Sequence, residues 1–222
     1  MSGLFLYLLF ESGSVNTVSD RVRINSARNL NLCRAGVTMP VADSPDSFFQ
    51  SIAEQIENEL PPVHLWHPAE TKDIGMLITR DGTWWHQGSP IGRRRMVRLF
   101  SRVLRREGND YFLVTPVEKV RVDVEVAPLL AVRMGMRDVP EPEITFHTNV
   151  GDVVVVDREH SIRMLGTPEA PLPVVEVRNG IEALMTRNVY YELVERCELV
   201  RRNGDEVAVV RSRGCTFELG MV

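Results

Sequence analysis

The chain has 222 residues, of which 25% are charged and 44% are hydrophobic, and its formal net charge is −4. This balance is typical of a globular protein and excludes both a fibrous repeat and a generally basic protein that coats nucleic acid. The longest apolar run, residues 4–10, is too short for a membrane helix, which needs about 18 residues. Three cysteines are too few for a disulfide scaffold and indicate a reducing compartment, so we expect a cytoplasmic protein.

Residues 1–38 differ in pattern from the rest of the chain. No basic segment precedes the apolar run and Glu11 follows it directly, whereas a secretory signal has a basic start and a small-residue cleavage site. Three interpretations stay open: a wrongly assigned start with Met39 as the true first residue, a disordered arm, and a degenerate export or membrane signal. On the first interpretation the functional chain spans 39–222, which is enough for one large domain or two small ones.

Residues 39–60 are expected to form a leading helix. Ser44, Pro45 and Asp46 supply a capping residue, a first-turn proline and a first-turn acid. Apolar residues then recur at helical spacing until two prolines at 61 and 62 end the helix.

Beyond residue 60 the pattern is mostly that of strands. A hairpin turn is expected at Asp81-Gly82, and a helix with an apolar stripe over about 92–107. Valine occupies every second position of 120–126 between charged residues, as in an antiparallel strand with one wet face. A further helix over 187–197 and a hairpin at Asn203-Gly204 complete a sheet-rich α+β fold. We expect a first half at 61–125 and a second half at 126–222.

The two expected helices suggest an internal repeat. The motif that begins at Arg93 can be laid on the motif that begins at Arg187 with a constant offset of 94 residues. A strand–helix–strand unit used twice explains this match. Coincidence stays open as the alternative, because an amphipathic helix that begins with arginine is common.

Several short motifs resemble a bacterial family known as domain of unknown function 1285, over about residues 61–220. They are Trp66-His67-Pro68, Asp81-Gly82-Thr83-Trp84, Gly88-Ser89-Pro90-Ile91, the run 113–120, Thr148-Asn149, Ile181-Glu182-Ala183 and the run 190–194. The resemblance implies a mixed α/β core built by duplication, with a C-terminal half loosely similar to pleckstrin-homology-like sheets. It further implies a pocket between the halves for a nucleotide-like ligand, and a signalling or stress role.

The second expected helix is the strongest electrostatic feature of the sequence. Seven arginines fall within 93–106, in a chain that is acidic overall. Near a helix start, Arg93 and Arg94 are placed to bind a phosphate or carboxylate, because free backbone N–H groups and the helix dipole also favour an anion there. The alternative is a solvated basic face that pairs with the acidic leading helix. An RNA or membrane surface is opposed by the net charge.

All three tryptophans lie within twenty residues, at 66, 84 and 85. In a strand, Trp84 and Trp85 point to opposite faces, so one is expected in the core and the other at an interface or a ligand. An indole can stack on a base, and packing alone is the alternative.

The remaining polar residues carry no catalytic signature. His64 and His67 have the spacing of a metal pair only in a helix, and the surrounding prolines favour extended chain. Phosphate-loop, dinucleotide-binding and nucleophile-elbow motifs do not occur in the sequence. We therefore expect neither a metal nor a cofactor, and an enzyme is the least favoured class.

Two hypotheses follow. The first is a cytoplasmic binding module that holds a small anionic, nucleotide-like ligand between its halves, with Arg93 and Arg187 on phosphate and Trp84 as a stacking surface. The second is a structural or assembly protein whose arginine-rich helix docks an acidic protein partner. The oligomeric state stays open. The candidate ligand-binding residues are Trp66, Trp84, Arg93, Arg94, Thr115, Glu118, Asn149 and Arg187.

Overall fold

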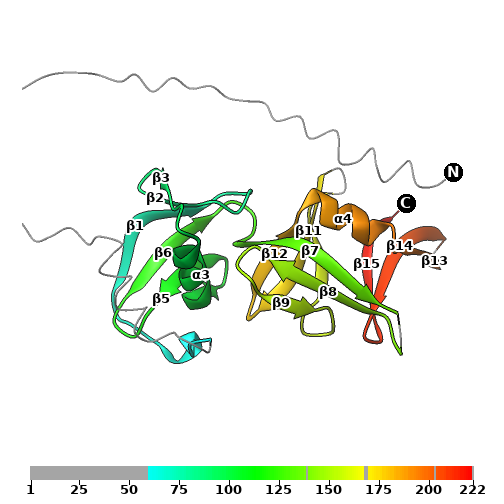
Figure 1. The fold of residues 1–222 in the computed structure, drawn as a ribbon, viewed down its shortest axis with the longest axis horizontal. Coiled ribbons are helices and arrows are strands. Elements are labelled where there is room, and N and C mark those ends of the chain that lie inside the picture. The colour runs from blue at the N-terminus through cyan, green and yellow to red at the C-terminus, as the bar shows by residue number, and fades with distance from the viewer. Residues whose placement is uncertain (1–59, 139, 168–169, 203, 222) are drawn as a thin grey trace, which may run out of the picture.

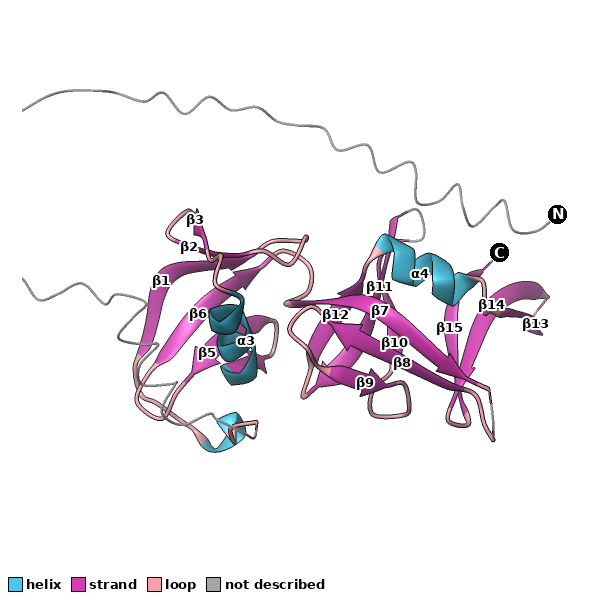
Figure 2. Cartoon of the chain, in the orientation of Figure 1, coloured by secondary structure: helices cyan, strands magenta, loops and turns pink. Residues whose placement is uncertain are grey.

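The computed structural model describes residues 60–138, 140–167, 170–202 and 204–221 (Figure 1). The predictions for residues 1–38 and for the leading helix at 39–60 lie outside these ranges, except for Leu60, which is not helical. Strands dominate the described part, which contains three sheets and two α-helices (Figure 2). The prediction of a sheet-rich fold is therefore confirmed.

The first half is one six-stranded sheet with a short 3₁₀ turn, η1 (Val63–Leu65), before it. Its strands are β1 (Thr71–Ile78), β2 (Trp84–His86), β3 (Ser89–Pro90), β4 (Leu104–Glu107), β5 (Asp110–Val114) and β6 (Lys119–Val124). Helix α3 (Arg94–Val103) connects β3 to β4. It lies on the side of the first sheet that faces the second half (Figure 1).

The second half contains another six-stranded sheet and a three-stranded antiparallel sheet. The six strands are β7 (Leu129–Arg137), β8 (Glu143–Thr148), β9 (Val153–Val155), β10 (Ile162–Thr167), β11 (Ala170–Arg178) and β12 (Ile181–Met185). Helix α4 (Arg187–Val194) follows β12 and packs on β7 and β12. The small sheet consists of β13 (Glu198–Arg202), β14 (Asp205–Ser212) and β15 (Cys215–Met221), and it contacts β8 and β10.

The two six-stranded sheets have the same topology. If the strands of each half are numbered one to six, both sheets read three-two-one-six-five-four. In each, the first and last strands pair in parallel at the centre, β1 with β6 and β7 with β12, and all other pairs are antiparallel. This shared order supports a duplicated fold.

The helices, however, are not equivalent parts of that repeat. Helix α3 lies between the third and fourth strands of its half, whereas α4 follows the sixth strand of its own. The alignment of Arg93 with Arg187 was therefore wrong as a guide to the duplication. Both helices begin with arginine and carry an apolar stripe because each packs one face on a sheet, and that requirement alone produces a similar pattern.

The core follows from the alternation of apolar and polar residues in the strands. In β6, Val120 and Val122 are buried while Arg121 and Asp123 are exposed, as the sequence predicted. The strand is antiparallel only to β5, however, and pairs in parallel with β1. A single cluster of buried side chains includes residues of both halves and of the small sheet. The halves and the small sheet are therefore packed together rather than tethered only by the chain.

Two elements differ from the sequence-based expectation. The second helix ends at Val103, and residues 104–107 form β4 instead of a last helical turn. Pairing with β5 supplies backbone partners in register, Leu104 with Leu113, and this tertiary contact outweighs the helical pattern of the arginines. Strand β12 was missed, because all five of its residues are buried, Glu182 included, and so short a segment has no polar–apolar alternation that marks it as a strand.

Candidate functional site

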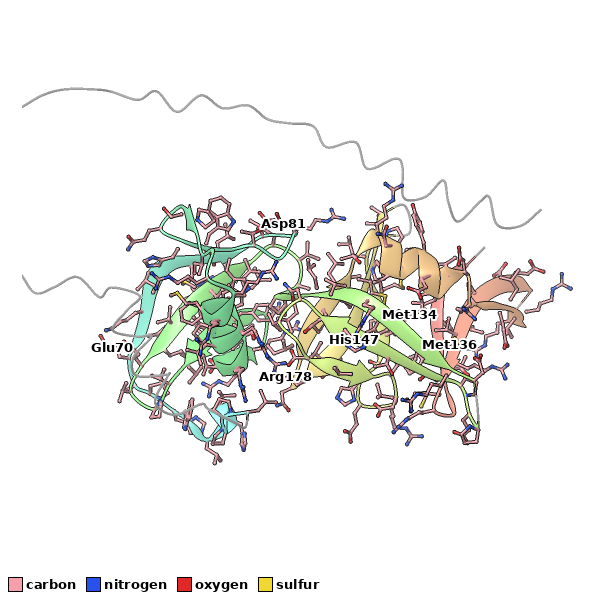
Figure 3. The ribbon with its side chains drawn as sticks, viewed as in Figure 1. Glu70, Asp81, Met134, Met136, His147 and Arg178 are labelled. Atoms are coloured by element: carbon pink, nitrogen blue, oxygen red, sulfur yellow. The ribbon has the colours of Figure 1, made fainter. Side chains whose placement is uncertain are left out.

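A cleft of about 710 Å³ lies between the two halves. The first half contributes the β1–β2 turn, Ile91 and the N-terminal part of α3, and the second half contributes the β8–β9 turn at residues 148–151. Asp81 of the β1–β2 turn lies toward the second half, whereas Glu70, just before β1, lies at the opposite end of that strand (Figure 3). The end of β1 at Ile78 is therefore the end that borders the cleft.

Three arginines of α3 line the cleft, and none of its lining residues is acidic. Arg94, Arg95 and Arg98 are exposed. Within the described ranges, no carboxylate lies at ion-pair distance from them. The cleft thus concentrates positive charge in a chain whose net charge is −4.

Asp81 and Asp152 are the acidic residues nearest in sequence to the cleft lining, and each is hydrogen-bonded to residues other than the cleft arginines. The hydroxyl of Thr79 donates to Asp81 Oδ1 at 2.6 Å and the backbone N–H of Thr83 donates to the same oxygen at 3.1 Å. These hydrogen bonds, that of Thr79 foremost, lower the pKa of Asp81 below its usual value. Asp152 accepts from Arg178 Nη1 at 2.7 Å, so neither carboxylate neutralises the cleft arginines.

The start of α3 adds free backbone donors to this charge. Its N-cap, Arg93, makes no side-chain cap hydrogen bond, and the first turn contains no acidic residue. The N–H groups of Met96 and Val97 both donate to Arg93 O, which leaves the earlier N–H groups of the helix without helical acceptors. Arg94 and Arg95 lie at the positive end of the helix dipole, which is an unfavourable arrangement that a bound anion relieves.

The β8–β9 turn holds the opposite wall of the cleft. Asn149 exchanges backbone and side-chain bonds with Leu130: its N–H donates to Leu130 O at 2.9 Å, and its Oδ1 accepts from Leu130 N–H at 3.1 Å. Gly151 has a φ of +98° and lies against Arg98, whose Nη2 would be 3.4 Å from a Cβ there. A side chain at Gly151 would therefore push on a guanidinium of the cleft.

Trp84 forms part of the cleft wall from inside the core. Its ring is only 1% exposed and stacks on Phe100 with a centroid distance of 6.1 Å. The predicted stacking role for Trp84 does not fit, because no ring face is open to a base. Trp85 is half-buried on the other face, as the strand alternation predicted. Trp84 Nε1 is buried without an acceptor in the described part of the chain.

The structure brings together only some of the predicted site residues. Trp84, Arg94 and Asn149 line the cleft, and Arg93 precedes it at the helix cap. Arg187 does not line it; it begins α4, where its Nε donates to Tyr191 Oη at 2.8 Å. The two helix starts therefore do not converge on one ligand, because the helices occupy different places in the repeat.

Thr115, Glu118 and Trp66 are also outside the cleft, and each has a structural role. Thr115 is 2% exposed, and its hydroxyl accepts from Glu118 N at 3.0 Å and closes the β5–β6 turn. Glu118 pairs with Lys72 at 3.0 Å. Trp66 accepts a hydrogen bond from Arg105 Nη1 on its backbone oxygen at 2.7 Å. Their turn lies beside the start of β1, since Lys119 is opposite Thr71, and so at the end far from the cleft.

The arginine run divides into two groups with different tasks. Arg105 and Arg106 belong to β4, and both are engaged: Arg105 binds the backbone of η1, and Arg106 binds Glu182 of β12. Arg95 and Arg98 were part of the run but not among the chosen site residues. Helical spacing places Arg94 and Arg98 on one face and could have selected Arg98.

In the part of the chain that the structure describes, no three His, Cys, Asp or Glu side chains are grouped so as to hold a metal ion. Over the same residues, no helix has the length and apolar character that crossing a membrane requires.

Fold and site together define a two-part protein of duplicated six-stranded sheets with a basic cleft between the parts. The chain belongs to the DUF1285 family: the model of its N-terminal domain, described as a domain of unknown function, matches residues 61–127, and the model of its C-terminal domain matches residues 128–219. The resemblance inferred from the sequence motifs is confirmed.

Two solved structures of the same family are similar to this chain. A DUF1285 family protein from Silicibacter pomeroyi DSS-3 is 42% identical, with a TM-score of 0.69, and the match covers 77% of this chain and 93% of that one. A DUF1285 family protein from Shewanella baltica OS155 is 30% identical, with a TM-score of 0.45, and the match covers 55% and 91%. No curated protein matches the chain.

Proposed function

We propose that this protein is a binding module that holds a small anionic, nucleotide-like ligand in the cleft between its halves. The observation that carries the proposal is the group of three arginines, Arg94, Arg95 and Arg98, in a cleft without a carboxylate. Guanidinium groups bind phosphate and carboxylate oxygens through paired charge-assisted hydrogen bonds, so an anion is the natural occupant.

The arginines of the rest of the two halves support this reading by contrast. Arg106, Arg163, Arg178 and Arg213 each have a carboxylate partner. Among the described residues, Arg94, Arg95 and Arg98 have no such partner, and all three line the cleft.

The size of the cleft suits a small organic molecule better than a bare ion. Its volume of about 710 Å³ falls within the range of about 300–1,000 Å³ that is usual for small-molecule sites. A nucleoside body would lie against Ile91, Val97 and Val150 without stacking on Trp84. The signalling or stress role, the cytoplasmic location and the likeness of the second half to pleckstrin-homology-like sheets remain predictions of the resemblance and the composition.

Docking of an acidic protein partner is the second candidate, and the exposure of Arg93, Arg94 and Arg95 favours it. The basic surface open to such a partner is shorter than the sequence suggested, because Arg105 binds the backbone of η1 and Arg106 binds Glu182. The titration described next also tests for this partner and for the oligomeric state.

The test is a thermal-shift and calorimetric titration of the full chain with mononucleotides, dinucleotides, cyclic nucleotides and simple phosphates. A ligand at 100 times its Kd stabilises by about 2.7 kcal/mol, which raises Tm by about 5–11 °C for a chain of this size. We expect such a shift with one class of anion, and its loss in Arg98→Gln.

The matched control is Arg201→Gln, which removes an exposed positive charge from β13. It leaves the shift unchanged if the cleft is the site. An anion whose shift persists in Arg98→Gln, or a protein that melts cooperatively with no shift for any anion, overturns the proposal. Salt-sensitive self-association in the second case would favour the acidic partner.

A further inference from the structure

We infer that the ligand of this cleft carries two linked phosphate groups, and this inference rests on the function proposed above. The cleft wall holds three guanidinium charges and no carboxylate. A carboxylate group offsets one of them, and a single phosphate ester contributes about 1.5–2 negative charges at pH 7. Two linked phosphates supply about three, which is the number that neutralises Arg94, Arg95 and Arg98 together.

The spacing of the arginines along α3 favours the same ligand. Arg94 and Arg98 are separated by four residues, so they share one face of the helix and lie about 6 Å apart along its axis. The charge is therefore spread over a full helical turn. Two linked phosphates offer each of these arginines its own pair of oxygens, whereas on a single phosphate they would share one group.

The second half closes this binding wall from the other side. Gly151 lies against the Arg98 guanidinium, and its missing side chain leaves room for that group beside the β8–β9 turn. Arg178 of the same half donates from Nη2 to Ser101 O at 2.7 Å and holds α3 at its other end. Arg178 lies between the two halves (Figure 3). The helix that carries the arginines is thus held by both halves, as a preorganised anion site requires.

The experiment is isothermal calorimetry of the full chain with inorganic pyrophosphate, orthophosphate and citrate, at equal ionic strength and pH 7.5. Citrate is the key comparison, since it is a tricarboxylate of similar charge with different oxygen geometry. We expect pyrophosphate to bind at least about tenfold more tightly than either of the others. Removing one charge-assisted partner, as in Arg98→Gln, is expected to weaken pyrophosphate about 10–100-fold.

Arg93→Gln is the matched control. It also removes one arginine charge, but from the N-cap of α3, and Arg93 does not line the cleft. We expect it to change the pyrophosphate affinity less than about twofold. Equal losses in Arg93→Gln and Arg98→Gln would show attraction by diffuse charge and overturn the inference.

The two proposals fail in different ways. Citrate that binds as tightly as pyrophosphate, with both weakened by Arg98→Gln, overturns the diphosphate inference and leaves the anion-binding module intact. Orthophosphate that binds as tightly as pyrophosphate likewise overturns the diphosphate inference and leaves the anion-binding module intact. Failure of all three anions to bind a folded protein overturns the diphosphate inference, and the binding module falls with it when the nucleotides also give no thermal shift.

Discussion

Arg106 of β4 donates from Nη1 to Glu182 Oε2 of β12 at 3.1 Å, and this ion pair joins the first half of the chain to the second. Glu182 is only 3% exposed and also binds Arg163. Arg106 reaches Gly180 O as well and lies over the ring of Tyr111 with a distance of 5.6 Å to its centroid. A buried carboxylate with one partner from each half makes the relative placement of the two halves depend on charge.

Arg106→Met is expected to lower the free energy of unfolding by about 2 kcal/mol. Removing one partner of a buried pair usually costs about 3–5 kcal/mol, and Arg163 still offsets part of the Glu182 charge. The measurement is urea unfolding followed by circular dichroism.

Arg121→Met is the control, because Arg121 forms an exposed ion pair with Asp110 in the same sheet. It should cost less than about 1 kcal/mol. Equal effects of the two substitutions would mean that the pair between the halves does not stabilise them.

Gly82→Ala tests the contact between the β1–β2 turn and the second half. Gly82 has a φ of +77°, and a Cβ there would lie 2.8 Å from Leu130 Cδ1 and 3.0 Å from Asn149 Nδ2. Gly108→Ala is matched in conformation, with a φ of +62° and no atom within 4 Å of its Cβ. Both variants carry the strain of a positive φ, about 1–2 kcal/mol.

We expect Gly82→Ala to be less stable than Gly108→Ala by about 1 kcal/mol, because only the new methyl group at Gly82 would collide with side chains of the second half. Chemical unfolding of both variants under the same conditions gives the difference. A difference near zero would mean that Leu130 moves aside freely.

Ser212→Ala tests how the small sheet is joined to the second half. Ser212 is fully buried; its hydroxyl donates to Val156 O at 2.6 Å and accepts from Ile144 N at 3.0 Å. The substitution leaves two buried backbone groups without this partner, so we expect a loss of about 1–3 kcal/mol in unfolding free energy. Ser89→Ala, at an exposed position of β3, is the control and should be nearly neutral. An unchanged Ser212→Ala protein would contradict the role of this hydroxyl.

The lowered pKa of Glu107 predicts that the stability of the fold depends on pH. Hydrogen bonding from Lys119 at 2.8 Å, aided by Arg105, lowers the pKa of Glu107 below its ordinary value of 4.5. Because the folded-state pKa is the lower one, this contribution is fully present above pH 4.5 and is lost as pH falls through the lowered value.

Thermal melts from pH 7 to pH 3 provide the measurement. Glu107→Gln should melt below the parent protein at pH 7, and the gap should close as pH falls below 4.5. A gap that is constant with pH would show that the carboxylate charge is not responsible.

The residue pattern predicted only part of the candidate site. A run of arginines in an acidic chain indicated an anion site, and Arg94 does line the cleft. The pattern could not show that the helix stops at Val103, since pairing of β4 with β5 decides that. That boundary places Arg106 in β4, where it binds Glu182.

The sequence by itself determined the local features of this protein. The alternation of valines in β6, the opposite faces of Trp84 and Trp85, and the turn residues at Asp81-Gly82 follow from the period and chemistry of neighbouring residues. Short motifs were also enough to indicate the family.

Only the tertiary structure decided which distant residues share a site. The parallel pairing of β1 with β6 places Thr115 and Glu118 beside the start of β1, while the cleft forms at its other end. The same repeat of sheets places α3 between the halves and α4 elsewhere, so Arg187 is separated from Arg93 despite its similar sequence setting. Strand order and register depend on contacts between segments far apart in the chain, and no local pattern records them.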